Sequence, residues 1–384
     1  MKWFRRILFG VIALAAVLGL GVFIALQFVS VNISVAQGSG TIADVILPEG
    51  FEISIFADNI DGARSMRLGD DGTLFVSSRA PGNVYAIPNA SSSDTAQEII
   101  TIASDLRSPN GIALVDGDLY VAEIGQIQRF DDIENNLMTA EATLVTDALP
   151  EAGHHGWRYL GYAPDGKLYV AIGAPCNVCE LEDMFGTIYR MNPDGTDLEE
   201  YVTGVRNSVG FDWHPDTGEL WFTNNGRDLM GDDIPPDTLH YAPEQGLHMG
   251  FPYCHAGTIP DPNFGDARSC DEFTPPAQPL TPHGAALGMR FYTGDSFPES
   301  YQNQIFIAEH GSWNRSTPIG YRIMLATVNE ANEVTSYEPF AEGWLNEETG
   351  QSWGRPVDVL VMPDGSLLVS DDAADTIYRI SYTG

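Results

Sequence analysis

Residues 165–171 read Asp-Gly-Lys-Leu-Tyr-Val-Ala, and this short stretch contains the pattern that organises most of the chain. The Asp-Gly pair favours a tight turn, and the β-branched and aromatic residues after it favour an extended strand. A second short strand is predicted at residues 187–191, which read Thr-Ile-Tyr-Arg-Met. The stretch therefore predicts a turn followed by two strands of one sheet.

Five further stretches have the same design, in which an apolar strand is followed by a second short strand. The strand pairs are 74–77 with 83–87, 119–122 with 127–130, 220–223 with 238–241, 305–308 with 321–324, and 367–370 with 376–380. The turn glycines Gly72, Gly117, Gly166 and Gly218 lie 45, 49 and 52 residues apart, which is the spacing of four-stranded propeller blades. We therefore predict an all-β fold, a six-bladed β-propeller over residues 46–384 whose ring hides the sheet edges.

The segment between the fourth and fifth units, residues 242–302, is too long for a simple connection between blades. Its prolines, among them Pro252, Pro260 and Pro262, favour an ordered loop over a helix. We expect an insertion that lies over one face of the propeller.

The first 30 residues predict a transmembrane helix that precedes the propeller. Lys2, Arg5 and Arg6 are basic, and the 23 residues from Ile7 to Val29 carry no charge. A helix of that length crosses a hydrocarbon core of about 30 Å. The basic end should stay in the cytoplasm, so the catalytic domain would be extracytoplasmic, in the periplasm or outside the cell. Residues 31–45 are then a linker, and cleavage of a signal peptide after Ala36 is the alternative.

The charge of the chain excludes some classes of partner. The net charge is −34, and no acidic residue precedes Asp44, so the domain after the linker is strongly acidic. Such a surface repels nucleic acid and anionic lipid headgroups. We expect no nucleic-acid partner, and membrane association only through the N-terminal helix.

Four cysteines occur in the extracytoplasmic part, and an even number there suggests disulfides. We predict two local bonds, Cys176–Cys179 and Cys254–Cys270, each closing a loop. A zinc site on Cys176, Cys179, Cys254 and His255 is the alternative.

Two adjacent histidines stand in residues 153–158, Gly-His-His-Gly-Trp-Arg, shortly before the strand at 168–171. Imidazole titrates nearest to neutral pH and can act as a general base without a large pKa shift. Either these are ordinary loop histidines held by hydrogen bonds, or one of them, His155, is the base of an active site.

Several other polar loops should reach the mouth of the same ring. They are residues 205–208, 225–228, 231–233, 309–315 and 354–359. Arginines that converge there would bind anions, and acidic, glycine-rich loops would hold a hard cation such as calcium. Cations, a metal and a histidine base together suit a redox cofactor that carries several carboxylates.

With these motifs in order, the chain resembles the soluble pyrroloquinoline-quinone (PQQ)-dependent glucose and sorbosone dehydrogenases. The resemblance covers about residues 46–382 and is nearest to the L-sorbosone dehydrogenase branch. It implies a quinoprotein oxidoreductase with PQQ and calcium as cofactors. Its substrate would be a sugar or sugar aldehyde that gives a hydride to the quinone, and the motifs leave the electron acceptor open.

The resemblance also assigns roles to residues of the first motifs. His155 falls on the catalytic base, and Arg206 with Asn207 falls on a pair that contacts the cofactor. Arg206 would also stabilise the charge that develops on the quinone oxygen. Gly226 and Arg227 fall where two backbone carbonyls bind the calcium.

Two arginines complete the expected cofactor site, and three positions depart from the family pattern. Arg355 falls on an arginine that contacts cofactor or substrate, and Arg315 is our candidate for the position of a cofactor-binding lysine. His154 stands where glucose-oxidising members have an acidic residue, and Val357 where they have a second arginine. Arginine and lysine are not equivalent at a carboxylate, so these departures bear mainly on glucose as the substrate.

Two other functions fit a propeller, because the fold alone does not determine function. One is a calcium-dependent lactonase-type hydrolase, which needs several carboxylate or amide ligands around one axial calcium. The other is a non-catalytic binding propeller. The dehydrogenase needs the histidine base and the arginines together.

Overall fold

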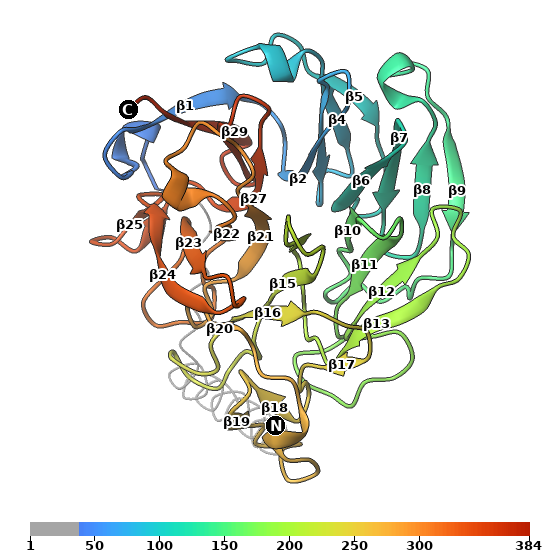
Figure 1. The fold of residues 1–384 in the computed structure, drawn as a ribbon, viewed down its shortest axis with the longest axis vertical. Coiled ribbons are helices and arrows are strands. Elements are labelled where there is room, and N and C mark those ends of the chain that lie inside the picture. Colours follow the sequence, from blue (N-terminus) through green and yellow to red (C-terminus); the bar gives the residue numbers. More distant parts are fainter. Residues whose placement is uncertain (1–37) are drawn as a thin grey trace, which may run out of the picture.

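The computed structural model describes residues 38–384, in which six blades, each with four antiparallel strands, surround a central axis, and one blade carries a fifth, parallel strand at its outer edge (Figure 1). Five blades use consecutive parts of the chain. Blade one consists of β2 (Ala63–Leu68), β3 (Leu74–Ser78), β4 (Val84–Ile87) and β5 (Ile100–Ala103), and blade two of β6 (Gly111–Val115), β7 (Asp118–Ala122), β8 (Ile127–Phe130) and β9 (Ala142–Thr146). Blade three consists of β10 (Tyr159–Tyr162), β11 (Leu168–Ile172), β12 (Thr187–Met191) and β13 (Glu199–Thr203), and blade four of β14 (Phe211–Trp213), β15 (Leu220–Asn224), β16 (Thr238–Ala242) and β20 (Gln278–Pro279). Blade five consists of β21 (Ala286–Phe291), β22 (Ile305–Glu309), β23 (Arg322–Val328) and β24 (Val334–Ala341).

The sixth blade joins the two ends of the described chain. It consists of β27 (Pro356–Val361), β28 (Leu367–Asp371), β29 (Thr376–Tyr382) and β1 (Phe51–Ala57). β1 pairs antiparallel with β29, with Phe51 opposite Tyr382 and Ile53 opposite Ile380. The predicted six-bladed propeller and all six predicted strand pairs are confirmed, and the ring closes through this non-local pairing.

The innermost strands β2, β6, β10, β14, β21 and β27 contact one another in turn around the axis. The hydrophobic core lies between adjacent blades. Along β3, Leu74 and Val76 pack in the cluster shared with blade six, whereas Phe75 packs in the cluster shared with blade two. Successive side chains of a strand point to opposite faces of the sheet. Because each blade packs against a neighbouring blade on either side, its middle strands must be apolar on both faces. This requirement explains the apolar runs that follow the turns.

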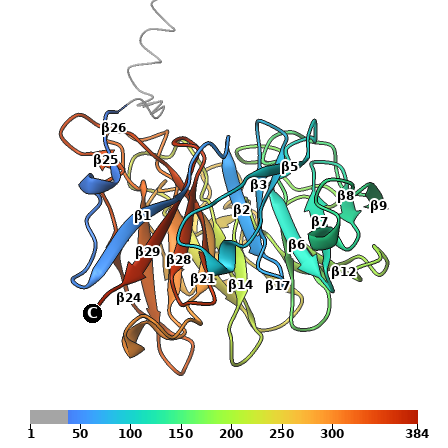
Figure 2. The same cartoon turned by 90° about the horizontal axis from the view of Figure 1, so that it is seen from above.

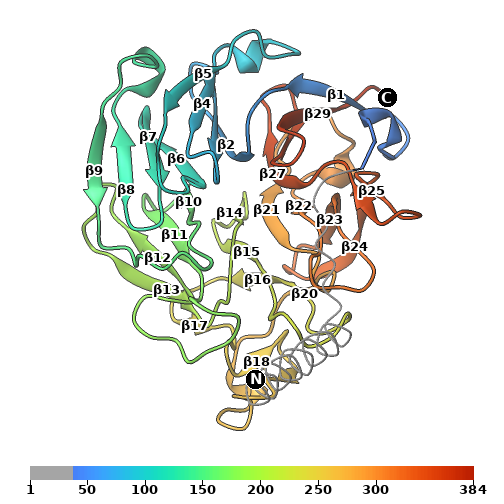
Figure 3. The ribbon, with the colours of Figure 1, turned by 180° about the vertical axis from the view of Figure 1, so that it is seen from behind.

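The segment 242–302 differs in part from the expected insertion. Two blade strands, β20 and β21, lie within it, so only part of the segment is an insertion. Its short strand β17 (Leu247–His248) pairs parallel with β13, and the hairpin of β18 (Cys254–His255) and β19 (Ile259–Pro260) lies outside the ring (Figures 1 and 3). The insertion therefore extends from the outer edge of blades three and four.

Short elements complete the described part of the chain. They are the hairpin strands β25 (Leu345–Asn346) and β26 (Gln351–Ser352) and the 3₁₀ turns η1 (Ile42–Asp44), η2 (Ala90–Ser92), η3 (Ile133–Asn135), η4 (Cys270–Glu272) and η5 (Glu299–Tyr301). The chain enters beside β25 and β26 (Figure 2), where the Gly38 amide donates a hydrogen bond to the Ser352 carbonyl at 3.0 Å. The linker expected at 31–45 is thus packed against blade five from residue 38 onward.

The predicted membrane anchor at residues 1–30 lies outside the described residues. From residue 38 to the C-terminus, no helix has the length and apolar character that a membrane span requires.

Closure of the ring gives the first testable prediction. The Phe51 ring packs edge-on against Phe297 and Phe340, with centroids 4.7 and 5.0 Å away. Phe51→Ala should lower the free energy of unfolding by about 3–5 kcal/mol, because it leaves a cavity at the closing strand. Urea denaturation measures the change. Ile55→Ala is the control on the same strand: Ile55 is 42% exposed, and its truncation should cost no more than about 0.5 kcal/mol. Equal effects would contradict the role assigned to Phe51.

Candidate functional site

A cavity of about 340 Å³ opens at the central axis, on the face where the loops after the second strands and before the inner strands emerge. Its lining includes five residues that the sequence predicted, namely His155, Arg206, Asn207, Gly226 and Arg355. These side chains come from four separate loops between residues 147 and 355. The fold therefore brings most of the predicted site together.

His155 is held in one orientation and one protonation state. Its Nδ1 lies 2.9 Å from the carbonyl oxygen of Ala174. A carbonyl only accepts hydrogen bonds, so Nδ1 carries the proton and the neutral ring keeps a lone pair on Nε2. Burial, the nearby positive charge of Arg206 and His154 lower the pKa of His155 to about 2. His155 is therefore a neutral imidazole with a free acceptor nitrogen beside the cavity.

The backbone around His155 is adapted to this position. His155 has a φ of 47°, in the left-handed region, and a Cβ on Gly173 would lie 2.6 Å from the Cβ of His155. Only glycine at 173 leaves the histidine its place. His154 lines the same cavity, and its ring centroid is 4.1 Å from that of His155. The ring of His155 is thus oriented by the Ala174 carbonyl and is in contact with His154.

Arg206 is buried and fixed by three polar neighbours. Its Nε donates to the Asn177 carbonyl at 2.9 Å, and its Nη2 donates to Asn177 Oδ1 at 2.9 Å and to Asp228 Oδ2 at 2.7 Å. Nη1 donates to the Asn225 carbonyl at 3.3 Å. A guanidinium has five N–H donors, so one donor on Nη1 remains for a ligand.

A disulfide closes the loop that positions Arg206. Asn177 lies between Cys176 and Cys179, which are bonded to each other. Besides accepting from Arg206, Asn177 Oδ1 accepts from the amide of Asp228 at 2.9 Å. Asn177 was not among the predicted site residues, and the Cys-x-x-Cys pattern around it was the available signal. The disulfide loop is therefore a support for the arginine.

The loop of Gly226 and Arg227 was expected to bind calcium through two backbone carbonyls. Gly226 lines the cavity, and its amide donates to Asp237 Oδ1 at 2.8 Å. Burial raises the pKa of Asp237 to about 7, against the opposing hydrogen bonds from Gly226 and Ala286. Within residues 38–384, no hydrogen bond ends on the carbonyl oxygen of Gly226 or Arg227. Both carbonyls keep their capacity to bind a cation.

Two predicted arginine side chains do not line the cavity. The guanidinium of Arg227 forms an ion pair with the buried Asp261 of the insertion and donates to Asn263. Arg315 donates to the carbonyl of Asp232 and to Asp233, in the loop between β15 and β16. Acidic partners in a neighbouring loop hold the side chain of Arg315, and it does not line this cavity.

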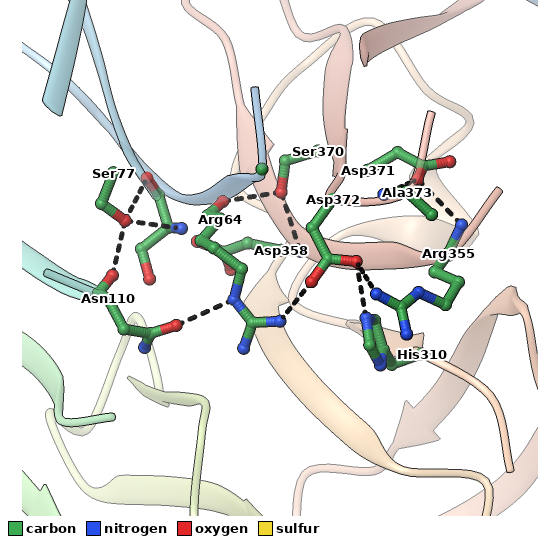
Figure 4. Close-up of polar contacts among 12 residues, drawn as sticks. Arg64, Ser77, Asn110, His310, Arg355, Asp358, Ser370, Asp371, Asp372 and Ala373 are labelled. Atoms are coloured by element: carbon green, nitrogen blue, oxygen red, sulfur yellow. Dashed lines mark hydrogen bonds and ion pairs between the residues drawn. The ribbon is translucent and has the colours of Figure 1, made fainter. Parts of the chain in front are cut away.

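Sequence reasoning missed a charged network on the opposite side of the cavity (Figure 4). Asp372 accepts hydrogen bonds from Arg64 Nη1 at 2.9 Å, from Arg355 Nη2 at 2.9 Å and from His310 Nε2 at 2.8 Å. Burial alone would raise the pKa of Asp372, but His310 and the two arginines hold it well below its usual value. Burial lowers the pKa of His310 to about 4, so His310 is neutral at pH 7. One carboxylate thus orients three groups that line the cavity.

Some polar atoms of the cavity wall have no protein partner. Asn314 is only 5% exposed, yet neither its Nδ2 nor its Oδ1 forms a hydrogen bond among the described residues, and the same is true of Arg355 Nε. A buried unpaired polar group costs about 1–3 kcal/mol. These atoms are therefore suited to a polar ligand.

The expected disulfides are both present and exclude the zinc alternative. Cys176–Cys179 and Cys254–Cys270 are bonded, and no cysteine of the chain is free. In the described range, no three His, Cys, Asp or Glu side chains converge as a metal site. A cation at this cavity would have to use backbone and amide oxygens as well as carboxylates.

The chain is therefore a six-bladed propeller whose axial cavity is lined by several arginine side chains and by a neutral histidine. The chain belongs to the family described as TrAA12-like, whose model matches residues 45–383. An uncharacterized protein of Borreliella burgdorferi is 34% identical over 350 residues, covering 88% of this chain and 90% of that protein. A pyrroloquinoline quinone-dependent pyranose dehydrogenase of Coprinopsis cinerea is 30% identical over 277 residues. That match covers 62% of this chain and 33% of the enzyme, so the chain spans about a third of its length.

Solved structures have the same fold at low sequence identity. A carbohydrate-active enzyme of family AA12 from Trichoderma reesei has a TM-score of 0.76 and 19% identity. The holo form of the PQQ domain of the Coprinopsis cinerea pyranose dehydrogenase has a TM-score of 0.75 and 18% identity. Both matches cover 88% of this chain and 97% of the other. None of the relatives named here is a sorbosone dehydrogenase, so the expected branch is not confirmed.

The support of Arg206 can be tested by stability. Asn177→Ala should lower the free energy of unfolding by about 1–3 kcal/mol, because it removes the acceptor of a buried guanidinium donor and of the Asp228 amide. Asn263→Ala is the matched control, since Asn263 also accepts from a guanidinium but is exposed, and Arg227 keeps its ion pair with Asp261. Urea unfolding of both variants is the measurement. If the two substitutions lower the free energy of unfolding equally, Asn177 does not have the supporting role for Arg206 that is assigned to it.

Proposed function

We propose that the chain is a PQQ-dependent dehydrogenase that oxidises a sugar or sugar aldehyde. The observation that carries the proposal is His155, a neutral imidazole with a free Nε2 in a cavity lined by arginines. Membership of the TrAA12-like family and the likeness to a pyranose dehydrogenase support the same class of reaction.

The residues of the cavity fit a quinone that carries several carboxylates. Among residues 38–384, Arg206 keeps one N–H donor without a partner, and Arg355 Nε and both side-chain amide atoms of Asn314 have no partner either. Guanidinium groups bind carboxylates through paired hydrogen bonds. Calcium fits the free carbonyls of Gly226 and Arg227, because hard cations take oxygen ligands. Asn207 lines the same cavity, and its backbone N–H donates a hydrogen bond to Asn224 Oδ1 at 3.0 Å.

When bound, the quinone would accept a hydride and the calcium would polarise the quinone carbonyl. The protein supplies the base and the charge around it. His155 Nε2 takes the substrate hydroxyl proton, while the Ala174 carbonyl keeps the other ring nitrogen protonated. Arg206, held by Asn177 and Asp228, places a positive charge where negative charge develops. Arg355 lines the opposite wall and adds a second positive charge there.

The two other functions receive less support from the site. A lactonase-type hydrolase needs several carboxylate or amide ligands around one calcium, and among the described residues no three His, Cys, Asp or Glu side chains converge as a metal site. Here Asp228 is paired with Arg206, and Asp372 is shared by Arg64, Arg355 and His310. A purely binding propeller would not require a histidine fixed with a free acceptor nitrogen.

For cellular location, we propose that residues 1–30 anchor the protein in a membrane with the propeller in an extracytoplasmic space. The two disulfides support an oxidising compartment. The intact mass of the mature protein should correspond to the full chain. A protein that begins at Gln37 would instead have lost a signal peptide.

The enzymatic activity is tested with the purified full chain, calcium and PQQ. We expect quinone binding in calorimetry and quinone-dependent reduction of an artificial dye when an aldose or sugar aldehyde is added. Absence of both, across a broad panel of sugars and polyols, would exclude the dehydrogenase.

The role of His155 is tested by substitution. His155→Ala should lower turnover by about 10²–10⁴-fold, the usual effect of losing a positioned base, while quinone binding persists. Because the pKa of His155 is lowered to about 2, the base stays deprotonated and should cause no loss of turnover from about pH 9 down to about pH 5. His154→Ala should cost less, and Arg206→Ala should weaken quinone binding as well. Near-normal turnover of His155→Ala with collapse of His154→Ala would show that the base is the other histidine.

A further inference from the structure

The cavity contains more positive charge than its own carboxylates neutralise. Four arginines line it: Arg64, Arg79, Arg206 and Arg355. Arg206 is paired with Asp228, and the other lining carboxyl, Asp237, has its pKa raised to about 7 by burial, so it neutralises little further charge. On the other wall, Arg64 and Arg355 share the single carboxylate of Asp372. The surplus therefore lies on the wall formed by blades one and six.

Arg79 is the guanidinium without an acidic partner. Among the described residues, no hydrogen bond or ion pair involves its side chain; instead it lies over the ring of Trp157, 4.7 Å from the centroid. Burial and the neighbouring Arg64 lower the pKa of Arg79 to about 10, so it stays charged at neutral pH. A half-buried charge of this kind is stabilised by an anion that the protein itself does not provide.

The position of Arg79 relates it to the reacting end of a substrate. Trp157, on which it stacks, lies next to the candidate base, with its ring centroid 5.9 Å from that of His155. The tryptophan is fixed from behind by the buried cluster of Val209, Leu287 and Val357. A molecule whose hydroxyl reaches His155 would therefore lie along the ring that carries the guanidinium.

We propose that Arg79, stacked on Trp157, binds an anionic group of the substrate, so that the substrate is an acidic sugar carrying a carboxylate or a phosphate. This inference rests on the proposed function, since it places the sugar beside His155. The shared chemistry is a charge-assisted hydrogen bond between a guanidinium and an oxyanion. Arg64, next to Arg79 and held by Asn110 Oδ1 at 2.9 Å, reinforces the positive field.

Equilibrium binding measures the proposal without using activity. Calorimetry on the full chain, with and without PQQ and calcium, compares glucose, glucuronate and glucose 6-phosphate. One of the two acidic sugars should bind at least about tenfold more tightly than glucose, and the advantage should shrink at high salt. Whichever acidic sugar is preferred identifies the anionic group as carboxylate or phosphate.

The variants isolate Arg79. Arg79→Gln should abolish the preference, so that the acidic sugar binds no more tightly than glucose does to the same variant, whereas Arg79→Lys should retain part of it. Arg268→Gln is the matched control: Arg268 also stacks on an aromatic ring, 4.4 Å from the centroid of Phe273, but lies outside the cavity. The Arg268→Gln variant should prefer the acidic sugar over glucose to the same extent as the unmodified chain. Unchanged unfolding of Arg79→Gln excludes a folding defect.

Several outcomes separate this inference from the proposed function. Equal binding of glucose and both acidic sugars, or loss of quinone binding alone in Arg79→Gln, overturns the inference; the second result would assign Arg79 to the cofactor. If the chain binds quinone and oxidises neutral sugars as well as acidic ones, the proposed dehydrogenase function is supported and the proposed anionic-sugar site is not. If no quinone binds but the acidic sugar depends on Arg79, the subsite stands and the dehydrogenase fails.

Discussion

Burial of both faces of every blade is the constraint on which the rest of the molecule depends. A middle strand such as β3 sends Leu74 and Val76 to one neighbouring blade and Phe75 to the other, so no blade completes its core alone. The last interface forms only when β1 pairs with β29. The ring is therefore one cooperative unit, and its rigidity allows loops from distant parts of the sequence to meet at the axis with fixed geometry.

The cavity at that axis collects charges that a hydrophobic core would exclude. Arg64 and Arg206 are 1% and 3% exposed, and isolated charges at that depth are unfavourable. They are tolerated because shared acceptors surround them: Asp372 binds two guanidiniums and His310, and Asn177 binds Arg206 through backbone and side chain. The same burial that disfavours charge keeps His155 neutral. The cost of burying the arginines and the neutral state of the His155 ring thus have one physical origin.

The remaining unpaired groups give the cavity its preference among ligands. In the described part of the chain, the guanidinium of Arg79, the Nε atom of Arg355 and the side-chain amide of Asn314 have no hydrogen-bond partner. In a domain of strongly negative net charge, this small positive region is also a local exception. It favours anionic molecules at the axis, whereas the outer surface repels them.

The sequence by itself determined the blades, because turn residues and apolar strands act locally and recur with a regular spacing. It also singled out His155, Arg206, Asn207, Gly226 and Arg355 in loops next to recognisable strands, and these residues line the cavity. Only the tertiary structure decided how the ring closes, since the pairing of β1 with β29 joins segments at opposite ends of the domain and has no local turn signal. It likewise turned Arg227 and Arg315 away from the cavity and brought in Arg64 and Arg79. The direction of a charged side chain is set by the partners it meets in space, and a single sequence does not specify which distant residues those are.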